Sequence, residues 1–328
     1  MNKRERLEKT FAGEATDRAP VALWRHWPGD DQRAADLARS TVEFQNAYDW
    51  DFIKVTASSN YSVTDYGVQD EWEGNLEGTR RTTRYIIERS LDWTDLRPLD
   101  PTRGALGRHL ECLRLIPGGL SDPETPILMT IFSPLVQAKH LSGEQLLLRH
   151  MRTSPDRVHT ALNVLTESTL RFIEELRRLP IAGIFYAIQH ASHDVMSVDE
   201  YQVFGLPYDR KILDSLPGTW WFNMLHLHGH APMFQFAAQF NVQAVNWHDQ
   251  DTEPDLPKGR SQIRGAACGG LSQWTHLHNG TPSSIKDAVR EAIILTNRRR
   301  LIVSTGCVSM ITSPLSNLRA VRETVEGV

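Results

Sequence analysis

The stretch SPDRVHTALNVLTESTLRFIEELRRLPIAGIFYAIQ, residues 154–189, decides how the rest of the chain is interpreted. Its first part, through about Arg178, has apolar residues at helical spacing and opens with Ser154 as N-cap and Pro155 at the first helical position. Its last part, residues 181–189, is a nearly continuous apolar run, which is typical of a strand covered on both faces. The stretch therefore predicts a helix followed by a buried parallel strand.

The same alternation of short apolar runs and amphipathic segments extends in both directions along the chain. Further strands are predicted at residues 20–26, 51–56, 126–132, 219–228, 242–248, 263–270 and 301–306. Helix starts are expected at Ser283-Ser284 and at Ser313-Pro314. Eight strands with intervening helices in 328 residues predict an α/β fold, a single (β/α)8 TIM barrel.

One segment departs from this regularity. Residues 61–125 predict a β-rich excursion or lid after the second strand. No internal repeat, low-complexity tract or linker divides the chain, so residues 1–328 are expected to form one domain.

Composition excludes several classes of protein. The formal net charge is −4, which provides no basic footprint for nucleic acid or for an anionic membrane surface. The three cysteines are too few and too far apart for a disulfide framework or a CxxC site. No apolar run approaches the roughly 18 residues of a membrane span, and the charged N-terminus does not resemble a signal peptide. The sequence predicts a protein of the reducing cytoplasm.

Chemically active side chains gather where the predicted strands end. In a parallel barrel these positions meet around one opening, which is where catalysis occurs in this fold. Of the 13 histidines, five fall there, and they are joined by an arginine, an aspartate and a cysteine. These residues are Arg25, His26, His190, His226, His228, His248, Asp249 and Cys307. The sequence therefore predicts an active site at this end of the barrel.

His226 and His228 form the sharpest local pattern. Residues i and i+2 of a strand point to the same face, so both imidazoles project into the barrel mouth. Cys307 at another strand end is able to add a thiolate, and zinc accepts this combination of nitrogen and sulfur ligands. Two alternatives stay open: the histidines hydrogen-bond only to their neighbours, and Cys307 is a buried small apolar residue.

The roles of two cationic residues near the strand ends, Arg25 and Lys54, each allow two interpretations. The guanidinium of Arg25 suits recognition of a substrate carboxylate, but a packed salt bridge explains it equally well. Lys54, inside the second predicted strand, either pairs with a carboxylate within the barrel or reaches the mouth.

At this point the chain resembles the uroporphyrinogen decarboxylase superfamily, which includes the zinc-dependent, corrinoid-linked methyltransferases. The resemblance covers nearly the whole chain and is carried by DRAPVALWRH (17–26), IFSPLVQAKHLSG (131–143), SVDEYQVFGLPYDRKIL (197–213) and LIVSTGCVSMITSPLSNLRAV (301–321).

Particular positions separate the two branches of this superfamily. The decarboxylases have a second arginine where this chain has Gly29, and a histidine where it has Cys307. They also have an aspartate after strand two, where this chain has residues 58–60, Ser-Ser-Asn. The methyltransferases bind zinc through an HxC motif on strand five and a cysteine after strand eight. This chain resembles them at His226 and Cys307, with His228 in place of the middle cysteine.

The resemblance implies a zinc-dependent methyltransferase that moves a methyl group between a corrinoid and a thiol or similar acceptor. The chain has no cobalamin-binding DxHxxG sequence, so the corrinoid is expected on a partner protein. Zinc is expected on His226, His228 and Cys307, with His190 or Asp249 as fourth ligand or proton acceptor. The residues expected to bind the small-molecule substrate are Arg25, His26, His140 and His248. Relatives also imply a homodimer.

Two further functions remain alternatives. A metal-free decarboxylase or other lyase acting on a carboxylated substrate requires several arginines at the barrel mouth, for which the sequence offers Arg25 and, less clearly, Arg264. A non-catalytic barrel that binds a small molecule or a metal requires no group that moves protons, and the strand-end histidines argue against it.

Overall fold

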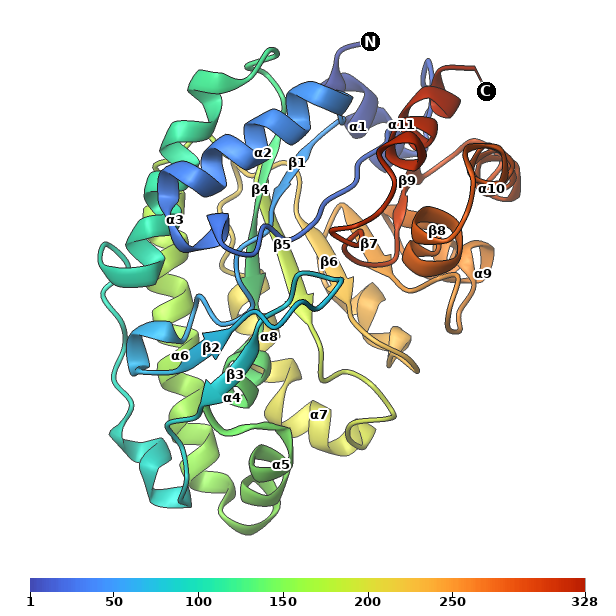
Figure 1. The fold of residues 1–328 in the computed structure, drawn as a ribbon. Coiled ribbons are helices and arrows are strands. Elements are labelled where there is room, and N and C mark those ends of the chain that lie inside the picture. Colours follow the sequence, from blue (N-terminus) through green and yellow to red (C-terminus); the bar gives the residue numbers. More distant parts are fainter. Residues whose placement is uncertain (328) are drawn as a thin grey trace.

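The computed structural model describes residues 1–327, and a curled parallel sheet of seven strands forms its centre (Figure 1). The strands pair in the order β1-β4-β5-β6-β7-β8-β9, and every residue in them is buried. Their bounds are β1 Ile53–Val55, β4 Ile127–Phe132, β5 Gly183–Ile188, β6 Met224–Leu227, β7 Ala244–Trp247, β8 Ala266–Leu271 and β9 Leu301–Thr305. Burial on both faces explains the continuous apolar runs and confirms seven of the predicted strands.

The first predicted strand, residues 20–26, is not a regular strand. It is an extended segment that forms one isolated parallel bridge, between Val21 and Val303 of β9. On its other side, the backbone N–H of Asp51 donates to the Val21 carbonyl at 2.9 Å. The segment therefore lies between the two edge strands of the sheet, β1 and β9.

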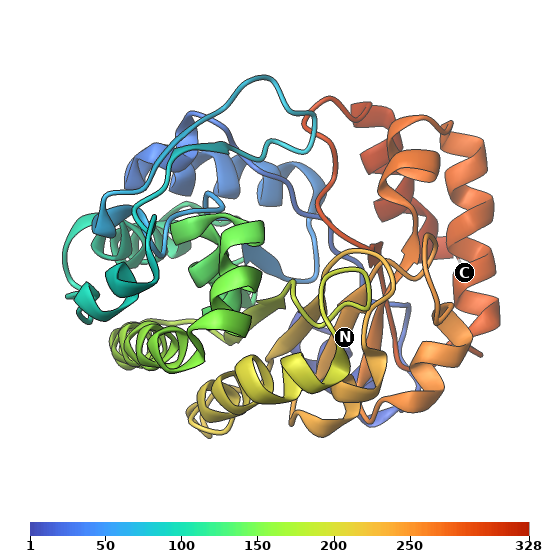
Figure 2. The ribbon, with the colours of Figure 1, turned by 90° about the horizontal axis from the view of Figure 1, so that it is seen from below.

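Helices surround the sheet on its outer face, as the view along the strands shows (Figure 2). Their bounds are α1 Lys3–Ala12, α2 Ala34–Tyr48, α3 Gly104–Leu115, α4 Pro134–Ser142, α5 Glu144–Thr153, α6 Pro155–Leu176, α7 Val198–Phe204, α8 Leu206–Leu213, α9 Leu256–Gln262, α10 Pro282–Leu295 and α11 Leu315–Thr324. The predicted start of α6 is confirmed. Helix α10 begins earlier than predicted, because Thr281 is its N-cap and accepts a hydrogen bond from the N–H of Ser284.

The segment 61–125 contains the antiparallel hairpin of β2 Gln69–Glu71 and β3 Arg81–Arg84, together with α3 and three short 3-10 helices. The loop between the two strands, residues 72–80, is called the hairpin loop below. The Leu76 carbonyl in this loop accepts a hydrogen bond from the Ile311 N–H at 2.7 Å. Gly78 has φ +78°, and a Cβ there would lie 2.6 Å from the Cβ of His26, so only glycine lets the loop approach this closely. The contact places the hairpin loop beside the strand ends.

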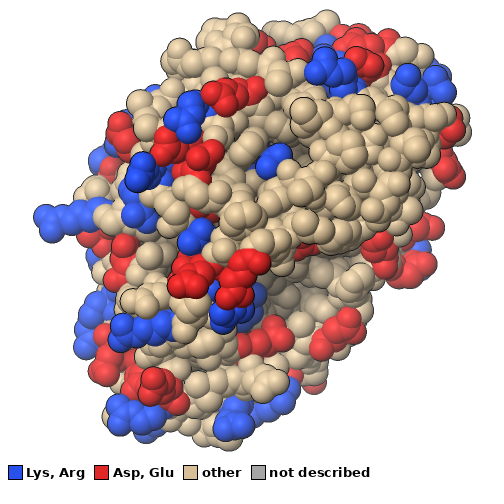
Figure 3. Space-filling model, in the orientation of Figure 1, with Lys and Arg blue, Asp and Glu red and all other residues tan. Residues whose placement is uncertain are grey.

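On the face shown in Figure 3, basic and acidic side chains are interspersed rather than separated into single-sign patches. Within residues 1–327, no helix is both long and apolar enough to cross a membrane.

Candidate metal centre

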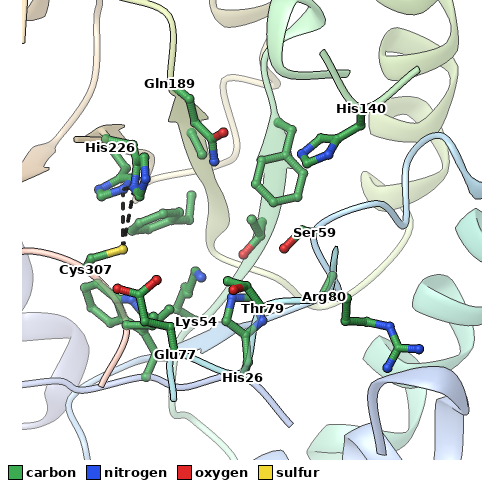
Figure 4. Close-up of a pocket in the computed structure, with 18 of the residues that line it drawn as sticks. His26, Lys54, Ser59, Glu77, Thr79, Arg80, His140, Gln189, His226 and Cys307 are labelled. Carbon is green, nitrogen blue, oxygen red and sulfur yellow. Dashed lines mark hydrogen bonds between the residues drawn. The ribbon is translucent and has the colours of Figure 1, made fainter. Parts of the chain in front are cut away.

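A cavity of about 310 Å³ lies at the carboxyl ends of the strands, where the sequence predicts the active site. Its lining comes from the segment 20–26, strands β1 and β4–β6, the hairpin loop, α4 and the residues after β9. Figure 4 shows the principal side chains around it. The polar ones are His26, Lys54, Ser59, Glu77, Thr79, Arg80, Thr130, Lys139, His140, Gln189, His226, His228 and Cys307.

Four potential metal ligands meet at one side of this cavity. The donor atoms of His226, His228, His248 and Cys307 all lie within 4.8 Å of one another. Cys307 Sγ is 4.0 Å from His226 Nε2 and 3.7 Å from His228 Nδ1. The two imidazole nitrogens are 3.4 Å apart. The structure thus brings together the three residues predicted as zinc ligands and adds a fourth.

The spacing of these donor atoms fits a tetrahedral ion. Zinc bonds of about 2.0 Å to nitrogen and 2.3 Å to sulfur place neighbouring donors about 3.3–3.6 Å apart. The separations among His226, His228 and Cys307, 3.4–4.0 Å, are at or above this range, and the whole cluster spans up to 4.8 Å, so the side chains must move together to hold one ion. His248 Nε2 is buried and has no hydrogen-bond partner among the described residues, which leaves its position open to an ion or a substrate group.

The protonation states of these side chains favour metal binding at the imidazoles. Burial lowers the pKa of His228 to about 3 and that of His248 to about 4, and it holds the pKa of His226 well below its usual value. All three rings are therefore neutral at pH 7 and have a lone pair for a cation. Burial also raises the pKa of the Cys307 thiol to about 11, so a cation must displace its proton to bind the sulfur.

Two lysines flank the cluster. Lys54 in β1 lies under the hairpin loop with Nζ 4.7 Å from the centre of the Phe185 ring, and burial lowers its pKa to about 7. Lys139 in α4 donates from Nζ to Gln189 Oε1 at 2.8 Å. Among the described residues, no carboxylate oxygen lies within 4 Å of either ammonium group. For Lys54 the sequence left two possibilities, pairing with a carboxylate inside the barrel or reaching the mouth. In the structure Lys54 reaches the cavity at the mouth.

The hairpin loop contributes the charged side chains that close the cavity. Glu77 supplies a carboxylate to the lining, and partial burial raises its pKa. Arg80 Nε donates to Asp70 Oδ1 at 2.6 Å, and its guanidinium points away from the His226–Cys307 cluster in Figure 4. The charge of Arg80 is therefore already neutralised by its neighbour in the hairpin.

Of the four residues predicted to bind substrate, two line the cavity, one belongs to the metal cluster beside it, and one lies outside. His26 and His140 line it, and His248 joins the metal cluster. Arg25 points to the other side of the segment 20–26, because neighbouring residues of an extended chain face opposite ways. Its guanidinium lies over the Trp27 ring at 4.5 Å, outside the cavity.

The two residues predicted as proton acceptors are buried beside the cavity rather than in its lining. His190 is fully buried, neither ring nitrogen has a hydrogen-bond partner among the described residues, and Nε2 lies 4.0 Å from Glu144 Oε2. Asp249 turns its carboxylate toward β8 and accepts a hydrogen bond from the Gly270 N–H at 3.0 Å. Arg264, the second arginine considered for a decarboxylase, is exposed just before β8, at the opposite end of the sheet.

Sequence reasoning missed Lys139, Glu77, Thr79 and Arg80. Lys139 stands directly before His140 in a helix that follows a strand, so its place at a strand end was a usable signal. The other three lie in an irregular loop, and no local pattern indicates that this loop folds over the barrel mouth.

Comparisons with known proteins agree with this geometry. Residues 75–328 match the family "Uroporphyrinogen decarboxylase (URO-D)", and the chain belongs to this family. It is 19% identical over 334 residues to the methylcobamide:CoM methyltransferase MtbA of Methanosarcina acetivorans, covering 98% of this chain and 96% of that protein. It is 25% identical over 202 residues to a methylated-thiol–coenzyme M methyltransferase of Methanosarcina mazei, covering 61% of this chain and 52% of that protein.

Solved structures support the same fold. A methyltransferase from Methanosarcina mazei superposes with a TM-score of 0.84 at 18% identity, covering 99% of this chain and 98% of that one. A B12-independent methionine synthase from Shewanella sp. W3-18-1 superposes with a TM-score of 0.58 at 13% identity, covering 94% and 93%. The predicted resemblance to the methyltransferase branch of the superfamily is confirmed, since the named relatives are methyltransferases.

Proposed function

We propose that this protein is a zinc-dependent methyltransferase that moves a methyl group between a corrinoid, carried by a partner protein, and the sulfur of a small thiol. The observation that carries the proposal is the cluster of three imidazoles and one thiol at the cavity wall. The names of the relatives, which specify methylcobamide and thiol substrates, support the same reaction.

We assign the zinc to His226, His228 and Cys307, with His248 as the fourth group of the cluster. Bound there, zinc supplies Lewis acidity that lowers the pKa of a thiol brought next to it. His248, whose Nε2 has no partner in the described chain, is the member best placed to give way to an incoming sulfur. His190 and Asp249, the earlier candidates for this position, are held away from the cavity.

The charges around the cavity indicate that the thiol also carries an anionic group. Two lysines face the cavity against one carboxylate, Glu77, while Arg80 is paired with Asp70. Three neutral imidazoles and one thiolate leave zinc with one positive charge, and the lysines leave another. A thiolate with a second negative charge balances both. We propose that Lys54 and Lys139 bind this second charge, because a buried ammonium without a counter-ion is costly.

Glu77 is the carboxylate best placed to accept the proton that leaves the thiol and to pass it on to solvent, which it partly faces, so that the carboxylate is again ionised. It lines the cavity, unlike Asp249, and its raised pKa makes it a stronger base than an exposed glutamate. His26 and His140 line the cavity beside the lysines, and we assign them to substrate binding. The hairpin loop, which holds Glu77 over the strand ends, excludes water from the sulfur.

Metal content of the purified protein tests the proposal first. About one zinc per chain is expected in the wild type, with loss of the metal in Cys307→Ser and in His228→Ala. Arg25→Ala is the matched control, since Arg25 lies near the same strand ends but outside the cavity. Absence of metal after zinc is supplied would overturn the zinc assignment.

Thiol binding to the zinc-loaded protein, measured by calorimetry, tests the substrate class. We expect 2-mercaptoethanesulfonate and 3-mercaptopropionate to bind at least about tenfold more tightly than 2-mercaptoethanol, and cysteamine more weakly still; tenfold corresponds to about 1.4 kcal/mol. Lys139→Gln is expected to remove this preference while leaving the zinc content unchanged. Equal affinity for the four thiols would contradict the role of the lysines. Demethylation of methylcobalamin, followed by its visible spectrum, then tests methyl transfer.

The metal-free lyase is less well supported by the geometry. It requires several arginines at the barrel mouth, whereas Arg25 lies outside the cavity, Arg264 is at the other end of the sheet and Arg80 is neutralised. The methylcobalamin assay distinguishes an enzyme from a barrel that only binds a metal, because only the enzyme demethylates methylcobalamin.

The remaining expectations concern organisation. We propose that the segment 20–26 occupies the position of the eighth strand of the barrel. We also propose that residues 1–328 form one domain and that the protein is a cytoplasmic homodimer. The bridge at Val21 supports the first point, and the three unpaired, buried cysteines support a reducing compartment. Light scattering in solution measures the oligomeric state.

A further inference from the structure

Asn246 in β7 is fully buried directly beside the metal cluster. It pairs in register with His226 of β6 on one side and with Cys268 of β8 on the other. Neighbouring residues at the same register of a parallel sheet face the same way, so the Asn246 side chain lies in the layer of the His226 ring. Three hydrogen bonds use its amide group, and their directions determine how the amide is oriented.

The amide nitrogen of Asn246 faces two backbone carbonyls. Nδ2 donates to the Cys268 oxygen at 2.8 Å and to the Thr305 oxygen at 3.0 Å. The flipped amide would direct Oδ1 at both carbonyl oxygens and leave three acceptors without a proton among them. The two carbonyls, which belong to β8 and β9, therefore fix Oδ1 on the opposite side, toward His226.

The orientation of this amide determines the tautomer of His226. Asn246 Oδ1 is 2.6 Å from His226 Nδ1, and an amide oxygen only accepts hydrogen bonds. The proton of the neutral ring must therefore be on Nδ1. The lone pair is then on Nε2, the nitrogen that faces Cys307 and His228.

We infer that Asn246 is a positioning residue that fixes the tautomer and the ring orientation of His226 for metal binding. It acts through His226 and does not itself reach the cavity lining. The physical basis is that a hydrogen bond to the second ring nitrogen of a ligating histidine selects the tautomer and holds the ring, and loss of such a partner typically costs 10–100-fold in metal affinity. This inference rests on the proposed metal-binding function.

Zinc affinity, measured by competition with a chromophoric chelator, tests the inference without any assay of activity. Asn246→Leu, which keeps the approximate size but removes all three hydrogen bonds, is expected to weaken zinc binding by about 10–100-fold. Asn246→Asp keeps an oxygen that accepts from Nδ1 but turns its other oxygen toward the Cys268 and Thr305 carbonyls. It is therefore expected to be less stable, with a zinc affinity closer to the wild type than to the leucine variant. Wild-type affinity in a folded Asn246→Leu variant overturns the inference.

Asn317 provides a matched control for the loss of a buried amide. It is 1% exposed, and its Nδ2 also donates to two backbone carbonyls, those of Leu277 and Gly280. Asn317→Leu is expected to lower the free energy of unfolding as Asn246→Leu does, but to leave zinc affinity unchanged. Equal loss of zinc affinity in both variants would show a general effect of destabilisation and overturn the assignment.

A second measurement distinguishes failure of this inference from failure of the proposed function. Long-range ¹H–¹⁵N correlation spectra of metal-free protein labelled at histidine report which nitrogen of His226 is protonated, and His226→Gln identifies the signal. We expect the proton on Nδ1 in the wild type and a mixture of tautomers in Asn246→Leu. A proton on Nε2 in the wild type overturns the inference. A wild type without zinc affinity but with the proton on Nδ1 overturns the metal proposal alone.

Discussion

Two buried charged residues close together in the chain, Asp51 just before strand β1 and Lys54 within it, differ in whether an opposite charge lies beside them. Asp51, just before the strand, is fully buried and accepts hydrogen bonds at 2.7 Å from Arg6 Nη1, from Arg18 Nη1 and from the Val21 N–H. Lys54, three residues later, is nearly as buried but has no carboxylate within 4 Å among the described residues. The negative charge of Asp51 is therefore balanced by two arginines inside the protein, whereas the positive charge of Lys54 has no opposite charge beside it.

The difference separates residues that maintain the fold from residues that are available to a ligand. The Asp51 network joins α1, the segment 20–26 and β1 at the amino ends of the strands, where barrels carry no active site. At the carboxyl ends, Lys54 has no carboxylate within 4 Å among the described residues, and the ring nitrogens of His190 and Nε2 of His248 have no hydrogen-bond partner there. Unpaired polar groups cost stability, and the buried imidazoles without a full set of hydrogen-bond partners at this end, those of His26, His140, His190 and His248, indicate a binding function.

The largest effect is expected from breaking the Asp51 network. Asp51→Ala leaves two buried guanidinium groups without their shared carboxylate, which costs about 3–5 kcal/mol of unfolding free energy. Urea denaturation measures this loss. Asp17→Asn is the control, because Asp17 also pairs with Arg6 but has a side chain 37% exposed, and its effect should be smaller. Equal effects of the two variants would contradict the importance of burial.

Zinc bound to the cluster at the carboxyl ends of the strands should raise the free energy of unfolding. Free zinc at 1,000 times its dissociation constant is expected to raise the unfolding free energy by about 4 kcal/mol, because the ion binds only the folded chain. Thermal unfolding with zinc and with a chelator measures the increment. Cys307→Ser should lose it, whereas Asp17→Asn should retain it. The same increment in Cys307→Ser would place the zinc elsewhere.

Replacing the unpaired lysine should stabilise the protein rather than weaken it. Lys54→Met fills similar volume without a buried charge and is expected to add about 1–4 kcal/mol to the unfolding free energy at pH 7. Denaturation midpoints of the two proteins measure the difference. A destabilised Lys54→Met variant would mean that Lys54 has a structural partner.

The pH dependence of stability gives the same residue a second test. The pKa of Lys54 is about 7 in the folded protein and about 10.5 when unfolded, so between these values the unfolded state binds more protons. Stability of the wild type should therefore rise between pH 7 and pH 9 relative to Lys54→Met. Parallel pH profiles of the two proteins would contradict the lowered pKa.

The smallest effect is expected at Arg25. Its guanidinium lies over the Trp27 ring outside the cavity, so Arg25→Ala should cost no more than about 1 kcal/mol of stability. Thiol affinity of the zinc-loaded protein should stay at the wild-type value. Calorimetry measures the thiol affinity of Arg25→Ala beside that of Lys139→Gln. A loss of affinity in Arg25→Ala would mean that Arg25 does bind the substrate.

The strands and the core of the metal cluster were predictable because they depend on local pattern. A run buried on both faces must be apolar along its whole length, as at residues 183–188, and this holds whatever its neighbours are. The two-residue spacing of His226 and His228 places both rings on one face by backbone geometry alone. Their meeting with Cys307 needed one further assumption, that strand ends converge.

Local pattern did not predict where side chains lie at positions where the backbone leaves regular structure. Arg25 and His26 were treated alike because they are neighbours in sequence, yet in an extended segment only one of them can face the barrel. Glu77 and Arg80 reach the cavity only because Gly78 lets the hairpin loop pack against His26. Asp249 was expected at the cavity, but its side chain turns to the β8 backbone.

The sequence by itself determined the family, the order of strands and helices, and the residues that are able to bind a metal. The family followed from the resemblance of whole segments such as residues 301–321. The elements and the candidate ligands followed from periodicity and residue type, which short-range backbone geometry sets. Only the tertiary structure decided which side chains share one space: that His248 joins His226, His228 and Cys307, that Lys54 stays unpaired while Asp51 does not, and that Asn246 fixes the His226 ring. These contacts join strands far apart in the chain, so they depend on how the sheet curls and how its loops return, which no local pattern encodes.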